Sequence, residues 1–344
     1  MKILVTGSNG LIGSTVSQYF LDKNNYVFGI DNNMRQKLFG IKANTKEQRK
    51  TLSQDKKYIH YSIDIRSMKG LEKVFKKNKY DLIVHAAGQP SHDKARDIPI
   101  LDFEINTLGT LNLLELTRKY QKQAVFIFTS SNKVYGDNPN KITLIEKKNR
   151  YSYKDKRIGI DENMSIDQNV HSLMGASKLA ADIYVQEYGH YFGLKTTVLR
   201  LGCVTGCSHA SVKLHGFLSF LVKSLVHSNK YEVIGYKGKQ VRDQIDAIDV
   251  ATAIEEIYKK PNKGEVFNLG GGYTNSASIL ELVKLVSKKL NTNPKLSYNL
   301  NARVGDHICY ITDFTKFQNN YPKWKISKSI EEIIDQIIKY EKDY

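Results

Sequence analysis

The sequence has few cysteines, few prolines and no long apolar run, and each absence excludes a class of protein. Its three cysteines are Cys203, Cys207 and Cys309. Such a sparse and odd set predicts reduced thiols in a cytoplasmic protein rather than a disulfide framework. Its six prolines exclude long proline-rich linkers. No stretch approaches the roughly 18 apolar residues of a membrane-spanning helix, and the first residues are typical of a strand rather than a signal peptide.

Charge and cysteine spacing exclude further partners. The net charge is +17, but the lysines are scattered and no nucleic-acid-binding module is recognisable. We interpret the charge as a lysine-rich solvated surface and expect no nucleic-acid and no membrane partner, although such a field favours a small anionic substrate. Cys203 and Cys207 have no second Cys or His pair at ligand spacing, so we expect no metal site.

Short apolar strands alternate with helical patterns through the first half of the chain. The expected strands are continuous apolar runs, which is typical of a parallel sheet with helices on both faces. This pattern predicts an α/β fold with a Rossmann-type doubly wound parallel sheet. The expected strands are 3–5, 26–30, 58–61, 82–84 and 125–128, and the expected helices are 11–21 and 105–120.

A glycine-rich turn, Thr6–Gly13, joins the first expected strand to the first expected helix. Gly7 would permit the tight turn, Gly10 would let a pyrophosphate approach the helix N-terminus, and Gly13 would let helix and strand pack closely. Asp31 ends the second strand, where a carboxylate can accept hydrogen bonds from the adenosine ribose and would repel a 2′-phosphate. The pattern predicts NAD, rather than NADP, as the cofactor.

The sequence resembles the extended short-chain dehydrogenase/reductase family over nearly its whole length. The resemblance rests on Thr6-Gly-x-x-Gly-x-x-Gly13, Asn106-Thr-Leu-Gly-Thr-Leu-Asn-Leu-Leu-Glu115 and Thr129-Ser-Ser-Asn-Lys-Val-Tyr-Gly136. It implies that a smaller C-terminal α/β substrate lobe closes over the sheet. The NAD-binding residues that it implies are Gly7, Asn9, Gly10, Leu11, Ile12, Gly13, Asp31, Asn32, Arg35, Asp64, Ile65, Ala86, Ala87, Gln89, Asn106 and Lys178.

Two arginine-containing segments of the second half resemble the family's diphosphate-binding segments. They are Lys239-Gln-Val-Arg-Asp243 and Arg303-Val-Gly-Asp306. A forked guanidinium suits phosphate oxygens, and two converging arginines suit a diphosphate. The resemblance implies a nucleotide-diphosphate sugar as substrate. The substrate-binding residues that it implies are Gln89, Ser131, Asn132, Cys203, Arg242, Arg303 and Asp306.

One branch of the family, the CDP-paratose 2-epimerases, fits the sequence better than the others. The similar segments are Asp102–Asn106, Ser131–Asp137, an insertion that contains Gly159–Glu162, His171-Ser172, and Gly238–Asp243. Such enzymes oxidise a sugar carbon with bound NAD and return the hydride to the opposite face. The resemblance therefore implies an NAD-dependent nucleotide-sugar epimerase of surface polysaccharide biosynthesis.

The sequence departs from the family at the general base. The family has Tyr-x-x-x-Lys at a helix start, where the phenolate takes the proton of the sugar hydroxyl. This chain has Met174 at the Tyr position, although it keeps Lys178 and the hydroxyl of Ser131. A thioether cannot act as a base, so an active epimerase needs a replacement. The candidates are Lys133, Tyr135, His171, Cys203 and His209.

Two other functions remain open. Met174-Gly-Ala-Ser-Lys178 also resembles the inverting nucleotide-sugar 4,6-dehydratases, some of which have Met at this position. Their catalytic Asp-Lys pair corresponds to Asn132-Lys133 here, so the carboxylate is missing. Alternatively, Met174 is consistent with a non-catalytic protein that binds NAD or a nucleotide sugar. Against this third function, the chain retains Ser131, Lys178, Arg242 and Arg303.

The C-terminal half has its own pattern of elements. We expect a strand and tight turn at 266–272 and helices at 214–226, 276–290 and 326–340, with Ser276 as the cap of the second helix. We divide the chain into an NAD-binding Rossmann domain, 1–200, and a substrate-binding lobe, 201–344, with interleaved segments. The resemblance implies a homodimer or higher homo-oligomer formed through helices 105–120 and 172–193.

Overall fold

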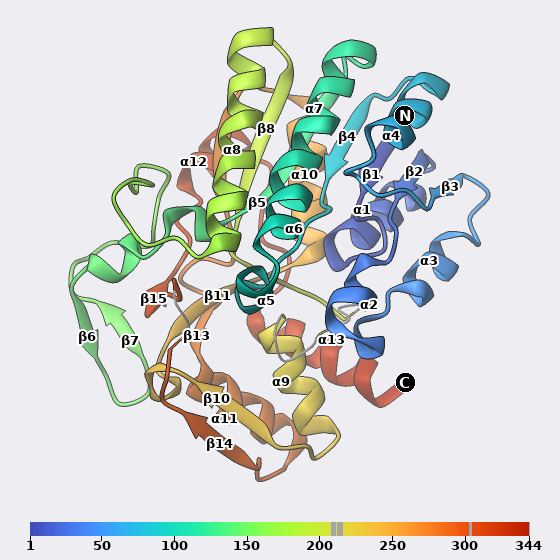
Figure 1. The fold of residues 1–344 in the computed structure, drawn as a ribbon. Helices are drawn as coiled ribbons and strands as arrows, with labels where there is room; N and C mark the ends of the chain where they lie inside the picture. The colour runs from blue at the N-terminus through green and yellow to red at the C-terminus, as the bar shows by residue number, and fades with distance from the viewer. Residues whose placement is uncertain (208–210, 212–215, 303–304, 344) are drawn as a thin grey trace.

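The computed structural model describes residues 1–207, 211, 216–302 and 305–343. Its largest element is a seven-stranded parallel sheet in the order β12-β8-β5-β4-β1-β2-β3 (Figure 1). The expected α/β fold with a Rossmann-type parallel sheet is therefore confirmed. The strands are β1 (Lys2–Thr6), β2 (Tyr26–Ile30), β3 (Tyr58–Tyr61), β4 (Leu82–His85), β5 (Val125–Ser131), β8 (Lys195–Leu201) and β12 (Glu265–Leu269).

Helices cover both faces of this sheet. They are α1 (Leu11–Asp22), α2 (Met34–Phe39), α3 (Lys46–Leu52), α4 (Met68–Lys77), α5 (His92–Asp97), α6 (Pro99–Phe103), α7 (Gly109–Tyr120), α8 (Leu173–Phe192), α10 (Ala247–Lys259) and α12 (Thr315–Asn320). Successive strand residues enter opposite cores, because side chains alternate along a strand. Along β1, Ile3 and Val5 pack into the core with α1 and α10, whereas Leu4 packs into the core with α4, α7 and α8.

The helix expected at 105–120 begins earlier than the sequence predicts. Helix α6 leads through a π-helical turn, Glu104–Leu108, directly into α7. Pro99 starts α6, where its missing N–H removes no helical hydrogen bond. The turn buries Ile105, Asn106 and Thr107. Such turns are frequent at functional sites, and this one brings the side chain of Asn106 beneath the cavity described below.

A second core holds the C-terminal lobe together. Three helices share it with the parallel pair of β10 and β14. A small sheet connects this lobe to the seven-stranded sheet. In it, β11 pairs with β9, and β9 directly follows β8 of the seven-stranded sheet. The elements of this lobe are α9 (Phe217–Val226), α11 (Ile279–Leu290), α13 (Ile330–Asp343), β9 (Cys203–Thr205), β10 (Tyr231–Ile234), β11 (Val241–Asp246), β13 (Ser276–Ser278), β14 (Leu296–Asn299) and β15 (Cys309–Tyr310).

Helix starts in this lobe differ from the sequence prediction. Ser276 does not cap α11, because it begins the short strand β13 (Ser276–Ser278), and the helix starts only after that strand. Ser278 is the cap instead: its Oγ accepts from the Glu281 N–H at 3.1 Å, while Glu281 accepts from the Ser278 N–H at 2.8 Å. This reciprocal pair fixes the start of α11. Helix α13 begins at Ile330 rather than 326, and residue 214, the expected start of α9, lies outside the described residues.

Segments from both halves of the sequence interleave around the large sheet. Strand β12 and helices α10 and α12 pack with this sheet although they follow residue 200. A domain boundary at residue 200 therefore separates neighbouring parts of one hydrophobic core. The hairpin of β6 (Leu144–Glu146) and β7 (Tyr151–Tyr153) precedes a loop whose Ile160 bridges to Thr312. Within the described ranges, no helix is both long and apolar enough to span a bilayer.

Candidate functional site

A cavity of about 440 Å³ opens at the carboxyl ends of the parallel strands, between the large sheet and the C-terminal lobe. Its walls come from the β1–α1 turn, the ends of β2, β4 and β5, the start of α8, and β9, α9 and β11. Ligands of open parallel sheets bind at this edge, where loops and helix N-termini converge. The cavity therefore brings together segments that lie far apart in the sequence.

The glycine turn forms one wall of the cavity. Gly7 has a left-handed φ of +67°, and a Cβ on it would lie 2.7 Å from the backbone nitrogen of Ala87. A Cβ on Gly13 would overlap the carbonyl oxygen of Gly7. Gly10 precedes α1 without any side-chain cap, so the first N–H groups of the helix remain available to an anion. The turn fits the pyrophosphate of a dinucleotide.

Asp31 follows β2 and lines the cavity beside this turn. Its two carboxylate oxygens accept from the N–H groups of Asn9, at 3.1 Å, and Asn33, at 2.7 Å. Burial raises the pKa of Asp31, and these two bonds act against that rise. The carboxylate is thus held in one orientation at the expected ribose position. Other predicted NAD-binding residues in the lining are Asn9, Leu11, Ile12, Asn32, Arg35, Asp64, Ile65, Ala86 and Ala87.

Gln89 and Asn106 are placed differently from the prediction of direct ligand contact. Gln89 is fully buried, and its Nε2 donates to Asp102 at 2.7 Å. Asn106 donates from Nδ2 to the carbonyl of Gln89, at 3.1 Å, and to Ser177 Oγ, at 3.0 Å. A buried carboxylate needs hydrogen-bond donors. Gln89 and Asn106 both donate to Asp102, so their side chains point away from the cavity wall. They position the segment above them, of which Ala86, Ala87 and Gly88 line the cavity.

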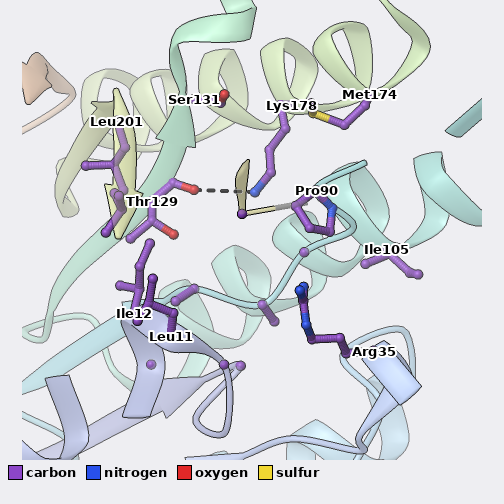
Figure 2. Close-up of a pocket in the computed structure, with 18 of the residues that line it drawn as sticks. Leu11, Ile12, Arg35, Pro90, Ile105, Thr129, Ser131, Met174, Lys178 and Leu201 are labelled. Carbon is purple, nitrogen blue, oxygen red and sulfur yellow. Dashed lines mark hydrogen bonds between the residues drawn. The ribbon is translucent and has the colours of Figure 1, made fainter. Parts of the chain in front are cut away.

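Lys178, Met174 and Ser131 converge on the middle of the cavity. Figure 2 shows Met174 and Lys178 extending from α8, one helical turn apart, toward the end of β5. Lys178 Nζ donates to the Thr129 carbonyl at 3.3 Å and lies 4.8 Å from the centre of the Phe128 ring. Burial lowers the pKa of Lys178 to about 8. The side chains of all three predicted catalytic residues thus share one space.

Lys133, Asp306 and Arg242 form a charged cluster at the far end of the cavity. Asp306 Oδ1 accepts from Arg242 Nη2 at 2.6 Å and from Lys133 Nζ at 3.2 Å. Burial alone would raise the pKa of Asp306, but the charges of Arg242 and Lys133 hold it far below its usual range. Two cations and one carboxylate leave a net positive charge, which suits a diphosphate. Arg303, the second predicted arginine, lies outside the described residues.

The other substitute bases are placed poorly for proton transfer. The Tyr135 hydroxyl is buried outside the lining, where it donates to Asn268 at 2.8 Å and accepts from Arg200 at 3.2 Å. His171 is also outside the lining, with Nε2 on the carbonyl of Ile166 at 2.9 Å. Cys203 lines the cavity, but burial raises its pKa to about 11. His209 lies outside the described residues.

Several lining residues were missed by the sequence analysis. Gln244 follows Arg242 by two residues on β11, so the period of a strand could have placed it on the same face. Phe217 and Leu218 enter the cavity from the start of α9, and Pro90 and His92 from the segment after β4. No motif marks Phe217 and Leu218, because the lobe contact that brings them to the cavity is not local in sequence, whereas Pro90 and His92 directly follow the predicted stretch 86–89.

The chain matches known proteins over nearly its full length. Residues 3–270 match the NAD dependent epimerase/dehydratase family. The chain is 33% identical to CDP-paratose 2-epimerase of Salmonella typhi, over 97% of this chain and 98% of that protein. Its structure is similar to UDP-glucose 4-epimerase of Thermotoga maritima with UDP-glucose, at a TM-score of 0.82 and 25% identity, covering 100% and 99% of the two chains.

A second solved structure has the same fold. It is UDP-glucuronic acid 4-epimerase of Bacillus cereus in complex with UDP-glucuronic acid and NAD. The TM-score is 0.83 at 22% identity, and the match covers 100% of this chain and 99% of that one.

Asp31→Ala should weaken NAD binding by about 1–3 kcal/mol, the cost of leaving buried hydrogen-bonding groups unpaired. Calorimetric titration of the cofactor-depleted protein measures this loss. Asp22→Ala is the matched control, because Asp22 is an exposed carboxylate at the other end of α1 that accepts from Gln18. Equal affinity in the Asp31 variant and the parent would remove Asp31 from the cofactor site.

Proposed function

The chain belongs to the NAD dependent epimerase/dehydratase family, whose cofactor is NAD, and we propose that it is a nucleotide-sugar epimerase of the CDP-paratose 2-epimerase type. One observation carries this proposal: a single cavity joins the dinucleotide turn, the Ser131–Lys178 region and the cationic Arg242 cluster. The similarity to the Salmonella typhi enzyme supports CDP as the nucleotide. We place the reaction in the synthesis of sugars for surface polysaccharides.

Different walls of the cavity would contact the diphosphate and the sugar of such a substrate. Arg242 and Lys133 would hold the diphosphate, with Asp306 fixing their positions until the substrate replaces it as their anionic partner. Arg303 joins them in this proposal through its segment's resemblance to the family. The sugar would then lie toward Ser131 and Met174, with Asn132 and Cys203 beside it.

NAD, when bound, accepts a hydride from a sugar carbon and returns it. The chain's residues supply the rest of the proposed reaction. Ser131 would donate its hydroxyl hydrogen to a sugar oxygen and so fix the reacting hydroxyl. Arg242, by binding the diphosphate, would retain the oxidised sugar in the cavity. The sugar ring could then rotate and present its opposite face to the cofactor. The apolar Met174 side chain, which is 4% exposed, would exclude water beside the reacting carbon.

A 4,6-dehydratase is the second candidate, because Met174 also occurs in some of those enzymes. Such chemistry needs a carboxylate beside the Ser131 segment. In the lining near Ser131, Asn132 takes that place, and Asp306 is engaged by Lys133 and Arg242. The geometry therefore favours epimerisation over dehydration.

Incubating the NAD-loaded protein with CDP-, UDP-, GDP- and dTDP-sugars tests these functions directly, with NMR of the products as the measurement. We expect an epimer from a CDP-linked deoxysugar. A 4-keto-6-deoxy sugar would establish the dehydratase instead. Tight binding of NAD and a nucleotide sugar, with no product from any of them, would establish a non-catalytic binding protein.

Arg242→Ala should weaken nucleotide-sugar binding by about 2 kcal/mol or more, because it removes one side of a buried charged contact. NAD affinity should not change, since Arg242 lies at the opposite end of the cavity from the glycine turn. Calorimetry with each ligand measures both effects. Arg118→Ala, which alters an exposed arginine on α7, is the control. Loss of NAD binding in the Arg242 variant would show that its place in the site is wrong.

We also propose that the protein is a homodimer formed through α7 and α8. Figure 1 shows these helices side by side with α6 on one face of the sheet. Their layer exposes large apolar side chains, which is typical of an interaction surface. The exposed residues are Ile100 and Phe103 of α6, Leu108 of the π-helical turn that leads into α7, and Ile183 and Tyr184 of α8.

Phe103→Asp should convert this dimer to monomers, because it places a charge within the proposed apolar interface. Light scattering after size-exclusion chromatography measures the mass. Tyr298→Asp is the matched control, because Tyr298 is equally exposed, at 53%, but lies on β14 of the other lobe. A parent protein that elutes as a monomer at micromolar concentration would contradict the proposal.

A further inference from the structure

We propose that Lys178 is itself the catalytic base, taking the sugar hydroxyl proton that a tyrosine phenolate takes elsewhere in the family. This assignment rests on the epimerase function proposed above. The residue one turn before Lys178 is Met174, whose thioether cannot accept a proton at neutral pH. The amine of Lys178 lies in the same cavity and has the lone pair that Met174 lacks (Figure 2).

The contacts of Lys178 leave its amine able to exist without charge. The hydrogen-bond partner of Nζ is the Thr129 carbonyl, at 3.3 Å, and a carbonyl can accept from a neutral amine as well as from an ammonium group. No carboxylate of the described residues forms an ion pair with it. A Cβ on Gly88 would lie 2.8 Å from Nζ, so the missing side chain there keeps the approach to the amine open.

The charged groups that face Lys178 come from three elements. Asp102 of α6 and Asp182 of α8 favour its ammonium form, but Asp182 is already paired with Arg200 at 3.0 Å. His85 of β4 is neutral, because burial and the nearby lysine charge lower its pKa well below the usual value. Burial outweighs the two carboxylates and lowers the pKa of Lys178 to about 8. The neutral amine is therefore a minor but accessible form near neutral pH, and it becomes the major form above about pH 8.

Lys133, the remaining lysine of the cavity, is suited to a different role. Burial lowers its pKa as well, but Asp306 opposes that shift and forms an ion pair with it at 3.2 Å. This pair stabilises the ammonium form, which is a donor and not a base. Lys133 thus matches the phosphate end of the substrate, whereas Lys178 faces the centre of the cavity.

The proton and hydride steps balance without another reactant. The sugar C–H bond breaks as its hydride passes to oxidised NAD, and the neutral Lys178 amine takes the hydroxyl proton, so a C=O bond and an ammonium group form. In the return step the ammonium gives that proton back to the sugar oxygen. A positively charged nicotinamide nearby disfavours the ammonium form, and its charge is lost on reduction. The proton affinity of Lys178 therefore rises as the sugar is oxidised.

Lys178→Arg separates proton transfer from charge. Arginine keeps a cation at this position but does not lose its proton in proteins. We expect turnover of the nucleotide sugar to fall by about a hundredfold or more, the scale of general-base catalysis. NAD and nucleotide-sugar affinities, measured by calorimetry, separate any loss of binding in this variant from the loss of turnover. A lysine that only orients the ribose would instead leave most of the activity in this variant.

A second base should rescue the arginine variant. Met174→Tyr combined with Lys178→Arg restores a phenol next to a cation, and we expect about tenfold or more of the lost turnover to return. Met174→Phe combined with Lys178→Arg is the matched control, because it adds the same ring without the hydroxyl. Equal activity of the two double variants, together with an active single Lys178→Arg variant, would overturn the assignment of Lys178 as the base and would favour Lys133 as the base.

The ionisation of Lys178 can be followed without turnover. The rate of its acylation by a lysine-selective reagent, read by mass spectrometry, should rise with pH with a midpoint near the pKa of about 8. The midpoint pH should be lower with oxidised NAD bound than with reduced NAD bound. Since the neutral amine is the active form, kcat/KM should rise with pH through the same value. A midpoint above about 10, the ordinary lysine value, would overturn the assignment. A parent without turnover on any nucleotide sugar would overturn the epimerase function and this assignment with it, whereas an active parent with an active Lys178→Arg variant overturns the assignment alone.

Discussion

A buried ion pair between Asp182 and Arg200 holds the catalytic end of the cavity together. The Arg200 guanidinium contacts both carboxylate oxygens at 3.0 Å, and the Ser130 hydroxyl donates to the same carboxylate at 2.7 Å. Because the carboxylate is fully buried, loss of either partner would leave an uncompensated charge costing about 3–5 kcal/mol. The pair joins α8, which carries Met174 and Lys178, to β8 and, through Ser130, to β5, so the positions of these two side chains depend on it.

Two other carboxylates, one behind the cavity wall and one in it, are held by different kinds of partner. Near the cofactor, Asp102 is satisfied by neutral donors, including Gln89 and Ser177, so it organises the wall without adding a cation. At the substrate end, Asp306 is held by the cations of Arg242 and Lys133. An incoming diphosphate would compete with Asp306 for these cations. With the proposed function, substrate binding would include the cost of rearranging this cluster, and a doubly charged ligand would repay that cost best.

Much of the fold and the glycine turn could be predicted because their signals are local. A parallel strand buried on both faces is a continuous apolar run, so the central strands are visible in sequence. Gly7 and Gly13 are required by backbone contacts within one strand–turn–helix unit. The cap of α11 was missed by two residues because Ser276 and Ser278 are both good caps, and only Ser278 forms the reciprocal pair with Glu281 in the structure.

The sequence by itself determined the parallel α/β architecture, the dinucleotide turn and the loss of the usual base at Met174, because each depends on a residue type at a fixed spacing. Only the tertiary structure decided which polar residues face the cavity. Gln89 and Asn106 turn toward Asp102, and Tyr135 turns toward Arg200. Lys178 extends into the cavity and donates to the Thr129 carbonyl. These orientations depend on partners distant in sequence, since each buried polar group turns to the nearest group that satisfies its charge or hydrogen bonds.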